Sequence, residues 1–282
     1  MVFLITGATG NIGARVVQRL LGRGERPRVL ARDPDKARAR FEGRVDVVAG
    51  DLADAASLAR ALSGVDALFL VNSGPGIEAC DEAAAKVAKA SGVSRLVKLS
   101  SGDAAEQVGT GVWHARGEAA IRATGIACAF VRPTGFMDNA LHWARSIKAE
   151  GVVRSCTGDG KIPFIHSDDI ADVATRVLTT AQYDGRALPI TGPEALSYAQ
   201  MTAKIGAAIE ATLTYEPISD EQVRRQQFAW EPDNAVVEAH LSIYRAIREG
   251  RLAEVTHGVE EVLGRRPVTF DQWVEQHASA FR

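Results

Sequence analysis

A glycine-rich loop near the start of the chain has residue types that can bind phosphate groups. It reads Gly7-Ala8-Thr9-Gly10-Asn11-Ile12-Gly13, follows an apolar strand pattern directly and opens an amphipathic helical pattern. Glycines here permit a tight turn, the close approach of a pyrophosphate and close packing of helix on strand. The amino end of the helix would present unpaired N–H groups and a positive dipole end to phosphates. The loop therefore predicts a dinucleotide site, and a glycine turn without a ligand is the alternative.

Arg32, which follows the expected second strand Arg28–Ala31, indicates which form of the cofactor is bound. Its guanidinium fork can make bidentate, charge-assisted bonds to the 2′-phosphate of NADP(H). An acidic residue at this place would instead bind the ribose hydroxyl of NAD(H). We therefore expect NADP(H) to be preferred. Asp33 keeps NAD(H) as an alternative, and Arg32 as a solvated charge or a helix cap is the structural alternative.

Polar and small residues also follow the later strand patterns. Asp51 can accept a bond from the adenine amino group while Leu52 lies on the ring, although Asp51 could instead cap the next helix. Ligands of open α/β sheets lie outside the carboxyl ends of the strands. We therefore expect further cofactor contacts at Val71, Asn72, Ser73, Ser100 and Pro133.

The same edge of the sheet predicts the substrate pocket. We expect the nicotinamide and the substrate to meet between residues 100–102 and 133–139. His114 is the candidate catalytic acid, because an unperturbed imidazole has a pKa near ~6.5; a packing histidine is the alternative, as core packing is for Phe136 and Met137. The predicted pocket residues are Ser101, Gly102, His114, Phe136, Met137 and Asn139.

A second polar cluster is interpreted as structural. His166, Asp168 and Asp169 could suggest a catalytic or metal site, but the two aspartates open a helical pattern at about 168–180. Carboxylates at that place cap a helix and favour its dipole. We expect Ser167 or Asp168 to be the cap and predict no metal site.

The elements that must position these residues alternate between strand and helix in the first half of the chain. Continuous apolar runs suit strands covered by helices on both faces, and repeated strand–helix units predict a doubly wound parallel sheet. A helix is expected near 138–150, and later strands at 188–190 and 213–215. We expect residues 1–135 to form the NAD(P)-binding domain and residues 136–282 a smaller, mainly helical substrate lobe, with strands within 152–216 returning to the sheet or the lobe. The expected strands are Val2–Thr6, Arg28–Ala31, Val45–Ala49, Ala67–Val71, Leu96–Leu99 and Ala127–Val131.

Composition narrows the classes of protein and partner. The 282 residues include 33 Lys+Arg and 35 Asp+Glu, and the formal net charge of −2 gives no general attraction to nucleic acid or anionic membranes. The three cysteines lack a Cys-x-x-Cys spacing, which indicates reduced thiols. No apolar run reaches the roughly 18–20 residues of a membrane span, and the first residues lack the basic start of a signal peptide. We expect a cytoplasmic protein with a small-molecule substrate, and monomer and homodimer both remain open.

The chain resembles the NmrA-like group of atypical short-chain dehydrogenases/reductases. The motifs that carry the resemblance are GATGNIG, GDL, LSSG, HARGEAAIRATG, VRPTGFMDN, FIHSDDIADVA and ITGPEALSYAQ. Within that group it is similar to bacterial NAD(P)H-dependent quinone, azo-dye and triphenylmethane reductases. The resemblance implies a Rossmann domain, a small substrate lobe and NADP(H) or NAD(H). It implies cofactor contacts at Gly7, Thr9, Gly10, Asn11, Ile12, Gly13, Arg32, Asp51 and Leu52.

One departure from the wider superfamily limits what the resemblance implies. Typical members carry a Tyr-x-x-x-Lys pair in the helix before the sixth strand, where the lysine lowers the pKa of the tyrosine. This chain has Val112-Trp113-His114-Ala115-Arg116 there, and its four tyrosines lie at 183, 198, 215 and 244. Ordinary carbonyl reduction and nucleotide-sugar epimerisation are therefore disfavoured. Arg116 could neutralise substrate or cofactor charge, or be an exposed helical arginine.

Three functions remain compatible with these residues. The first is hydride transfer from NAD(P)H to a quinone-like or other conjugated acceptor, which needs little acid–base help and relies on proximity and orientation. The second is a non-catalytic NADP(H)-binding redox sensor that signals to a protein partner. The third is a tailoring reductase of a biosynthetic pathway.

Overall fold

Seven parallel strands form the central sheet of the computed structural model, which describes residues 1–228 and 231–282. The order across the sheet is β3-β2-β1-β4-β5-β6-β9, so the chain changes its direction of travel between β1 and β4. All six neighbouring pairs are parallel. The predicted doubly wound Rossmann sheet is thus confirmed. The strands are β1 (Phe3–Ile5), β2 (Arg28–Ala31), β3 (Asp46–Ala49), β4 (Ala67–Leu70), β5 (Arg95–Leu99), β6 (Cys128–Pro133) and β9 (Ala187–Ile190).

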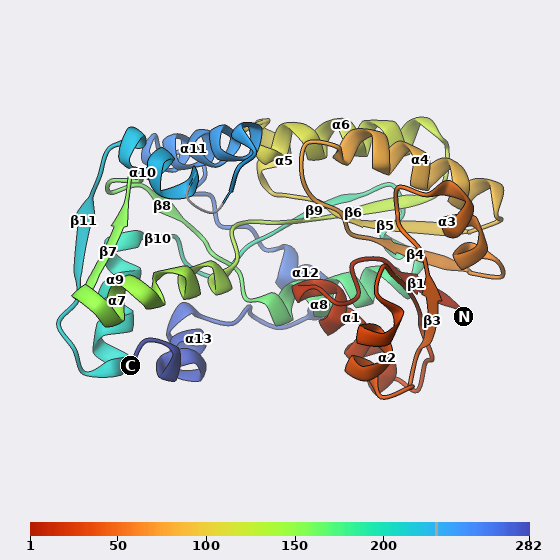
Figure 1. Ribbon diagram of the computed structural model, residues 1–282, viewed down its shortest axis with the longest axis horizontal. Helices are drawn as coiled ribbons and strands as arrows, with labels where there is room; N and C mark the ends of the chain where they lie inside the picture. The colour runs from red at the N-terminus through yellow and green to blue at the C-terminus, as the bar shows by residue number, and fades with distance from the viewer. Residues whose placement is uncertain (229–230) are drawn as a thin grey trace.

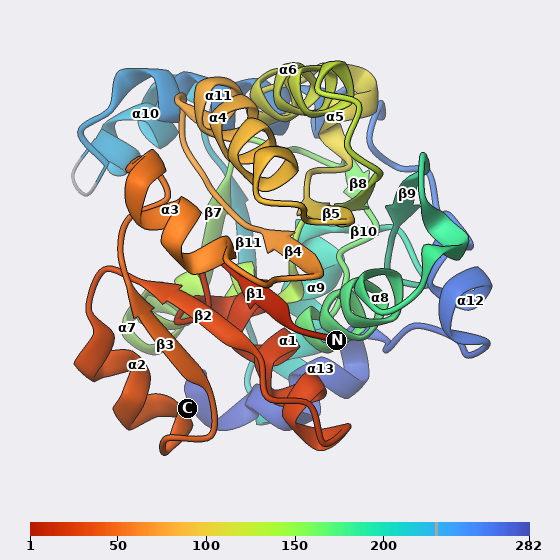
Figure 2. The ribbon, with the colours of Figure 1, turned by 90° about the vertical axis from the view of Figure 1, so that its right-hand side faces the viewer.

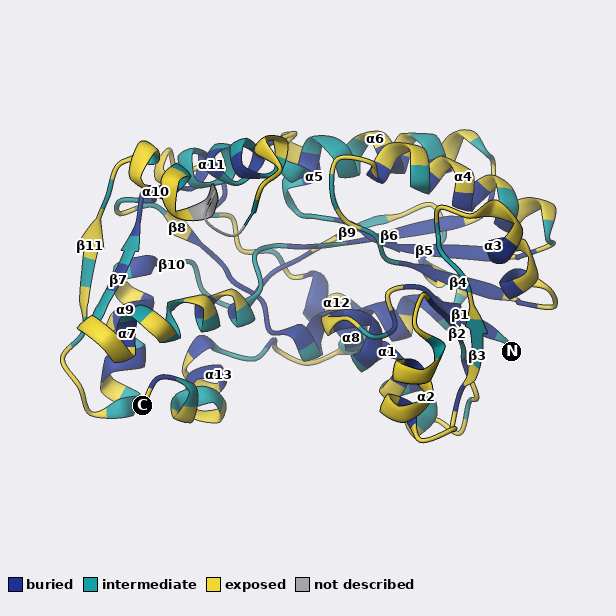
Figure 3. Cartoon of the chain, viewed as in Figure 1, coloured by how far each residue is buried: buried dark blue, intermediate teal, exposed yellow. Residues whose placement is uncertain are grey.

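Helices cover both faces of this sheet (Figure 1 and Figure 2). The central strands β4 and β5 are buried along their whole length, which explains why the sequence shows continuous apolar runs and no alternation. Figure 3 shows these strands as a buried layer between helices whose outer sides are exposed. One face carries α1 (Asn11–Gly22) and α8 (Ser167–Leu178); the other carries α3 (Ala55–Leu62), α4 (Ile77–Ala90) and α6 (Thr110–Ala123). Helix α2 (Pro34–Phe41) lies beside β3, and the short α5 (Asp103–Glu106) precedes α6.

Most of the chain after β6 forms a second, smaller lobe at one end of the sheet, on the left in Figure 1. Its own core surrounds Trp273, which is fully buried and stacks on Phe270 and His277. Two small sheets pair β7 with β11 and β8 with β10. Its elements are η1 (Met137–Trp143), α7 (Ala144–Glu150), β7 (Val152–Ser155), β8 (Lys161–Ile162), β10 (Leu196–Ser197), α9 (Tyr198–Ile209), β11 (Thr214–Pro217), α10 (Asp220–Phe228), α11 (Asn234–Arg248) and α13 (Phe270–His277). Helix α12 (Gly258–Leu263) instead packs against α8 and β9.

Two local expectations differ from the structure. Residues 138–150 form a 3-10 helix, η1, that leads into α7, where a single helix was expected. The expectation that Ser167 or Asp168 caps α8 is wrong: His166 is the cap, and its Nδ1 accepts the backbone N–H of Asp168 at 3.0 Å. An imidazole nitrogen can take the place of a capping oxygen because His166 has the extended backbone of a cap residue.

The C-terminal segment is tied to α8 through Asp169, whose side chain is fully buried. Its carboxylate accepts the Arg265 guanidinium at 2.6 Å and the backbone N–H of Val268 at 2.8 Å. The aspartate that the sequence offered as a candidate catalytic or metal residue therefore holds the chain that leads into α13. Among the residues that the structure describes, no cluster of acidic, histidine or cysteine residues could hold a metal ion, and no helix is long and apolar enough to cross a membrane.

We expect Asp169→Asn to lower the free energy of unfolding by about 2 kcal/mol. The substitution removes the charge from hydrogen bonds that are each worth roughly 1.5–3 kcal/mol. Asp271→Asn is the matched control, because Asp271 pairs with Lys204 on an exposed surface and should cost no more than about 0.5 kcal/mol. Urea unfolding of the two variants measures the difference, and equal losses would contradict the anchoring role of Asp169.

Candidate active site

The glycine loop leaves the amino end of α1 open for an anion. Gly7 has a φ of 59°, in the left-handed region, and its carbonyl accepts the N–H of Gly10 at 2.9 Å. A Cβ on Gly13 would lie only 2.2 Å from the Gly7 oxygen, so α1 packs directly on the loop. The cap residue Gly10 has no side chain, and no acidic residue stands in the first turn of α1. These residues fit a dinucleotide phosphate, because the first N–H groups of the helix keep their donors free.

The loop lies against the end of β4, where the strand order changes direction. Thr6 Oγ1 accepts the backbone N–H of Val71 at 2.7 Å. A Cβ on Gly7 would meet the Cβ of Val71 at 3.0 Å. The structure therefore brings two predicted cofactor residues, Gly7 and Val71, together at the crevice where open α/β sheets bind their ligands.

The structure shows which of the polar residues after β2 and β3 cap a helix and which remain available to a cofactor. The carboxylate of Asp33 caps α2 by accepting the N–H of Lys36 at 3.0 Å. Arg32 is exposed and makes no ion pair with any residue that the structure describes. Helix α3 is capped by Asp54, so Asp51 is not the cap; Asp51 Oδ1 accepts the N–H of Ala53 at 2.9 Å.

Arg40 is a basic residue at this end of the site that sequence reasoning missed. Its Nη1 donates to the carbonyl oxygen of Thr9 in the glycine loop at 3.0 Å. An arginine on the exposed side of a short helix carries no spacing signal, and only the fold shows that α2 brings it back to the loop.

A buried ion pair lies beneath the ends of β4 and β5. Lys98 Nζ is 2.6 Å from Asp81 Oδ2, and neither side chain is exposed. Asn72 donates to Asp81 at 2.7 Å and accepts from Lys98 at 3.3 Å. Burial lowers the pKa of Lys98 and raises that of Asp81, and the contact between the two groups offsets part of each shift. Gly117 makes room for the pair, since a Cβ there would lie 2.1 Å from Asp81 Oδ2.

A second polar cluster joins β5, β6 and α6. Glu118 is buried and accepts the Ser100 hydroxyl at 2.5 Å. Arg132 binds the same carboxylate through Nε at 2.9 Å and Nη2 at 2.5 Å. The predicted cofactor residue Ser100 is thus held by the Glu118 carboxylate, whose charge is balanced by Arg132. Glu118 was missed in the sequence, although its spacing of four from His114 places both on one face of α6.

His114 lies in the second turn of α6 and is partly buried. Its Nδ1 is buried and has no hydrogen-bond partner among the described residues. Burial, with a smaller contribution from the charge of Lys98, lowers the pKa of His114 to about 3. The imidazole is therefore neutral at neutral pH, and the unperturbed pKa assumed for the sequence does not apply. Its catalytic role stays a prediction.

The predicted pocket residues follow β5 and β6 side by side. The N–H of Gly102 donates to the carbonyl of Pro133 at 2.7 Å, which joins the ends of the two strands. Ser101 Oγ contacts Asp103, and burial raises the pKa of Asp103 to about 6. Asn139 is exposed, Phe136 is partly buried, and Met137 is buried in the core around Trp273.

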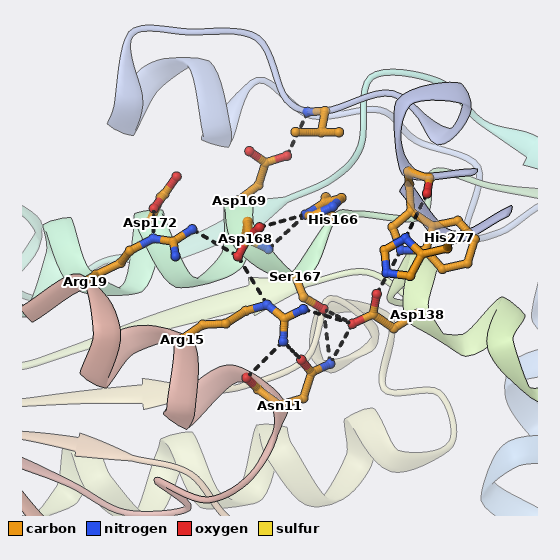
Figure 4. Close-up of polar contacts among 12 residues, drawn as sticks. Asn11, Arg15, Arg19, Asp138, His166, Ser167, Asp168, Asp169, Asp172 and His277 are labelled. Atoms are coloured by element: carbon orange, nitrogen blue, oxygen red, sulfur yellow. Dashed lines mark hydrogen bonds and ion pairs between the residues drawn. The ribbon is translucent and has the colours of Figure 1, made fainter. Parts of the chain in front are cut away.

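Asp138 connects the glycine loop to the second half of the chain (Figure 4). Its Oδ2 accepts Asn11 Nδ2 at 2.9 Å and the Ser167 hydroxyl at 2.6 Å. Its Oδ1 accepts Trp273 Nε1 at 2.9 Å. These hydrogen bonds hold the pKa of Asp138 below its usual value despite partial burial, and Arg15 adds a weaker attraction. Four segments, α1, η1, α8 and α13, therefore meet at one carboxylate.

Comparison with known protein families gives a match over residues 7–181 to a family described as NAD(P)H-binding. A (4-alkanoyl-5-oxo-2,5-dihydrofuran-3-yl)methyl phosphate reductase of Streptomyces griseus is 39% identical, over 99% of this chain and 99% of the relative. An NAD(P)H azoreductase of Xenophilus azovorans is 34% identical, again over 99% of each chain.

Solved structures agree on the fold. A crystal structure of an NADPH-dependent quinone oxidoreductase of Escherichia coli in complex with NADPH superimposes with a TM-score of 0.89. The match covers 98% of this chain and 99% of the other at 24% identity. At 24% identity, this similarity shows that the two proteins share a fold, which includes both the central sheet and the second lobe.

We expect His114 to make the protein less stable in mild acid. The unfolded chain binds a proton at this residue below pH ~6.5, whereas the native imidazole with its pKa of about 3 does not. The free energy of unfolding should therefore fall by roughly 1.4 kcal/mol per pH unit below that pH. Between pH 7 and pH 5 the loss should be about 2 kcal/mol larger for the wild type than for His114→Gln, as measured by urea unfolding.

The difference between the two proteins isolates His114. The raised pKa of Asp103 has the opposite effect, because a native carboxyl that holds its proton gains stability as the pH falls. That contribution is common to both proteins and cancels. Parallel pH dependences for the wild type and the variant would show that His114 titrates in the native state as in the unfolded chain.

Proposed function

We propose that this NAD(P)H-dependent oxidoreductase, which belongs to the NAD(P)H-binding, NmrA-like atypical short-chain reductases, acts on small molecules with a conjugated, electron-poor double bond. Quinones, azo compounds and enones form this class. The proposal rests on one observation above the others. A glycine loop that leaves the amino end of α1 open lies at the carboxyl edge of the sheet, and α6, which begins at the same edge, carries no tyrosine.

The glycine loop and the ends of the strands would hold the cofactor. The open amino end of α1 suits the diphosphate, and the exposed Arg32, with Arg40 near the loop, suits a 2′-phosphate. Asp51 and Leu52 would hold the adenine, and Val71, Asn72, Ser73, Ser100 and Pro133 would lie along the rest of the dinucleotide. When bound, the reduced nicotinamide supplies a hydride.

Conjugated acceptors need little proton transfer at the moment of reduction. The charge left by the hydride spreads over the conjugated system, so a proton can follow from water and no strong acid is required. Isolated carbonyls lack this delocalisation and depend on the acid that the tyrosine of typical superfamily members supplies. A half-buried imidazole with a pKa of about 3 cannot replace it as a charged acid near neutral pH.

The names of the relatives support the same class. They describe the reduction of an oxo-dihydrofuran that bears an alkanoyl group and of azo compounds, and the solved structure is of a quinone reductase. Ser101, Gly102, His114, Phe136 and Asn139 would surround the acceptor, with Met137 supporting them from the core. Residues 1–135 would then serve mainly the cofactor, and residues 136–282 would add the other wall of the site.

NADPH oxidation against matched acceptors tests this function. We expect enones, quinones and azo dyes to be reduced with a kcat/KM at least ~10²-fold above that of saturated ketones of the same skeleton, because general acid catalysis is worth about 10²–10⁴. The absence of turnover with every conjugated acceptor, despite saturable binding of NADPH, would refute the proposal. So would equal rates for enone and saturated ketone.

We expect Arg32→Asp to weaken NADPH binding by about 1.5–3 kcal/mol, the range for a hydrogen bond to a charged group, and to spare NADH. Arg38→Asp is the matched control, since Arg38 is exposed on α2 and pairs with Asp35. It should change neither affinity by more than about 1 kcal/mol. Calorimetric titration of both cofactors measures the effect; an equal loss for NADPH and NADH in Arg32→Asp would place Arg32 outside the 2′-phosphate site.

A further inference from the structure

One ring nitrogen of His114, Nδ1, is buried and has no hydrogen-bond partner in the described part of the chain. The side chain as a whole is only partly buried. His114 stands one turn before Glu118, whose carboxylate marks the ends of β5 and β6 through Ser100 and Arg132. Because α6 returns along the parallel sheet, its earlier turns lie farther toward the carboxyl edge, where the ligand binds.

The charged groups around α6 determine which nitrogen carries the proton. Lys98 of β5 is the charge that acts on the imidazole, and a positive charge favours a lone pair over an N–H on the side that faces it. A buried lone pair without a partner also costs less than an orphaned buried N–H. The proton therefore belongs on Nε2, and the ring carries no charge.

The other charged groups that the structure describes beside His114 are engaged by partners of their own or lie apart from Nδ1. From α4, Asp81 is engaged by Lys98 and Asn72; from α6 itself, Glu118 is neutralised by Arg132. From α5, Asp103 is a partly buried carboxyl that contacts Ser101. Helix α11 meets the start of α6 beside Gly109 with uncharged groups, the backbone carbonyl of Ala239 and the side chain of Ile243.

We propose that His114 donates a hydrogen bond from a neutral Nε2–H to the acceptor oxygen or nitrogen on which negative charge develops, and that Lys98 is the positioning residue that fixes this tautomer. The inference deepens the proposed reductase function and rests on it. The hydride brings two electrons and forms the new bond to the acceptor, while the conjugated double bond shifts its electrons to the oxygen or nitrogen. His114 keeps its proton throughout, and water supplies the proton that completes the product. A neutral imidazole can polarise an acceptor in this way because its N–H is a good donor.

Two substitutions at His114 separate donation from packing. The side-chain amide of His114→Gln can place an N–H near the position of Nε2, whereas His114→Phe fills the space without a donor. We expect His114→Phe to lose about 10²-fold in kcat/KM for the acceptor, the loss typical of one oxyanion donor, and His114→Gln to stay within about 10-fold of the wild type. The Kd for NADPH should be unchanged in both. Equal activities for wild type and His114→Phe would overturn the inference, as would a pH profile with an inflection near 6.5 that disappears in His114→Gln.

Nitrogen-15 NMR of the resting protein tests the tautomer without any acceptor. With histidines labelled and the His114 signals identified by their loss in His114→Gln, we expect the Nε2–H tautomer without titration from pH 5.5 to 8. A Nδ1–H tautomer or a midpoint near 6.5 would overturn the assignment even if the protein reduces quinones. Conversely, the expected tautomer together with no reductase activity would refute the proposed function alone.

The double variant Lys98→Met/Asp81→Asn tests the positioning role, since it removes both buried charges together. We expect the two tautomers of His114 to mix, while burial, the larger cause of its low pKa, keeps the ring neutral in that window. An unchanged spectrum in the folded double variant would show that Lys98 does not position the ring. Lys98→Arg, which keeps the charge, provides a second variant and should retain the Nε2–H tautomer.

Discussion

The contact of Gly13 with the Gly7 carbonyl is the constraint on which the rest of the site depends. Because any Cβ on Gly13 would lie 2.2 Å from that oxygen, only glycine lets α1 start this close to β1. The close start puts the amino end of α1 at the crevice beside β4, where its unpaired N–H groups can meet a diphosphate. It also places Asn11 within reach of Asp138, and through Asp138 the loop contacts Ser167 and the buried Trp273. The cofactor loop and the second half of the chain therefore share one hydrogen-bonded centre (Figure 4).

The chemistry at the carboxyl edge depends on how charge is buried there. Two carboxylates, Asp81 and Glu118, lie against α6, and each is neutralised by a cation from the sheet, Lys98 or Arg132. Unpaired buried charges would be strongly destabilising, whereas these pairs are completed by hydrogen bonds from Asn72 and Ser100. With these charges paired, the neutral and partly buried His114 is the group on α6 that we propose contacts the acceptor. Such a site is suited to acceptors that delocalise charge themselves.

Local patterns predicted the sheet well and the polar centres poorly. The glycine loop and the buried strands could be identified because each depends on neighbours in the sequence. The rule that ligands bind at the carboxyl ends of strands singled out Arg32 as a candidate, and its contact with the cofactor stays a prediction. Lys98 stands inside an apolar strand, and its partner comes from another element. Asp138 binds Asn11 and Trp273, which lie 127 and 135 residues away from it along the chain. The capping role of His166 and the pKa of His114 likewise depend on backbone geometry and burial that the sequence alone does not contain.

Tracing the transferred hydride tests whether this site reduces a conjugated double bond. NADPH carrying deuterium at either face of nicotinamide C4 would be oxidised by the protein in the presence of a cyclic enone, and the product analysed by NMR. We expect deuterium from one face only, bound at the carbon β to the carbonyl, with the α-hydrogen derived from water. Deuterium at the carbonyl carbon, or a reduced product that lacks deuterium with both labelled cofactors, would contradict conjugate reduction by this site.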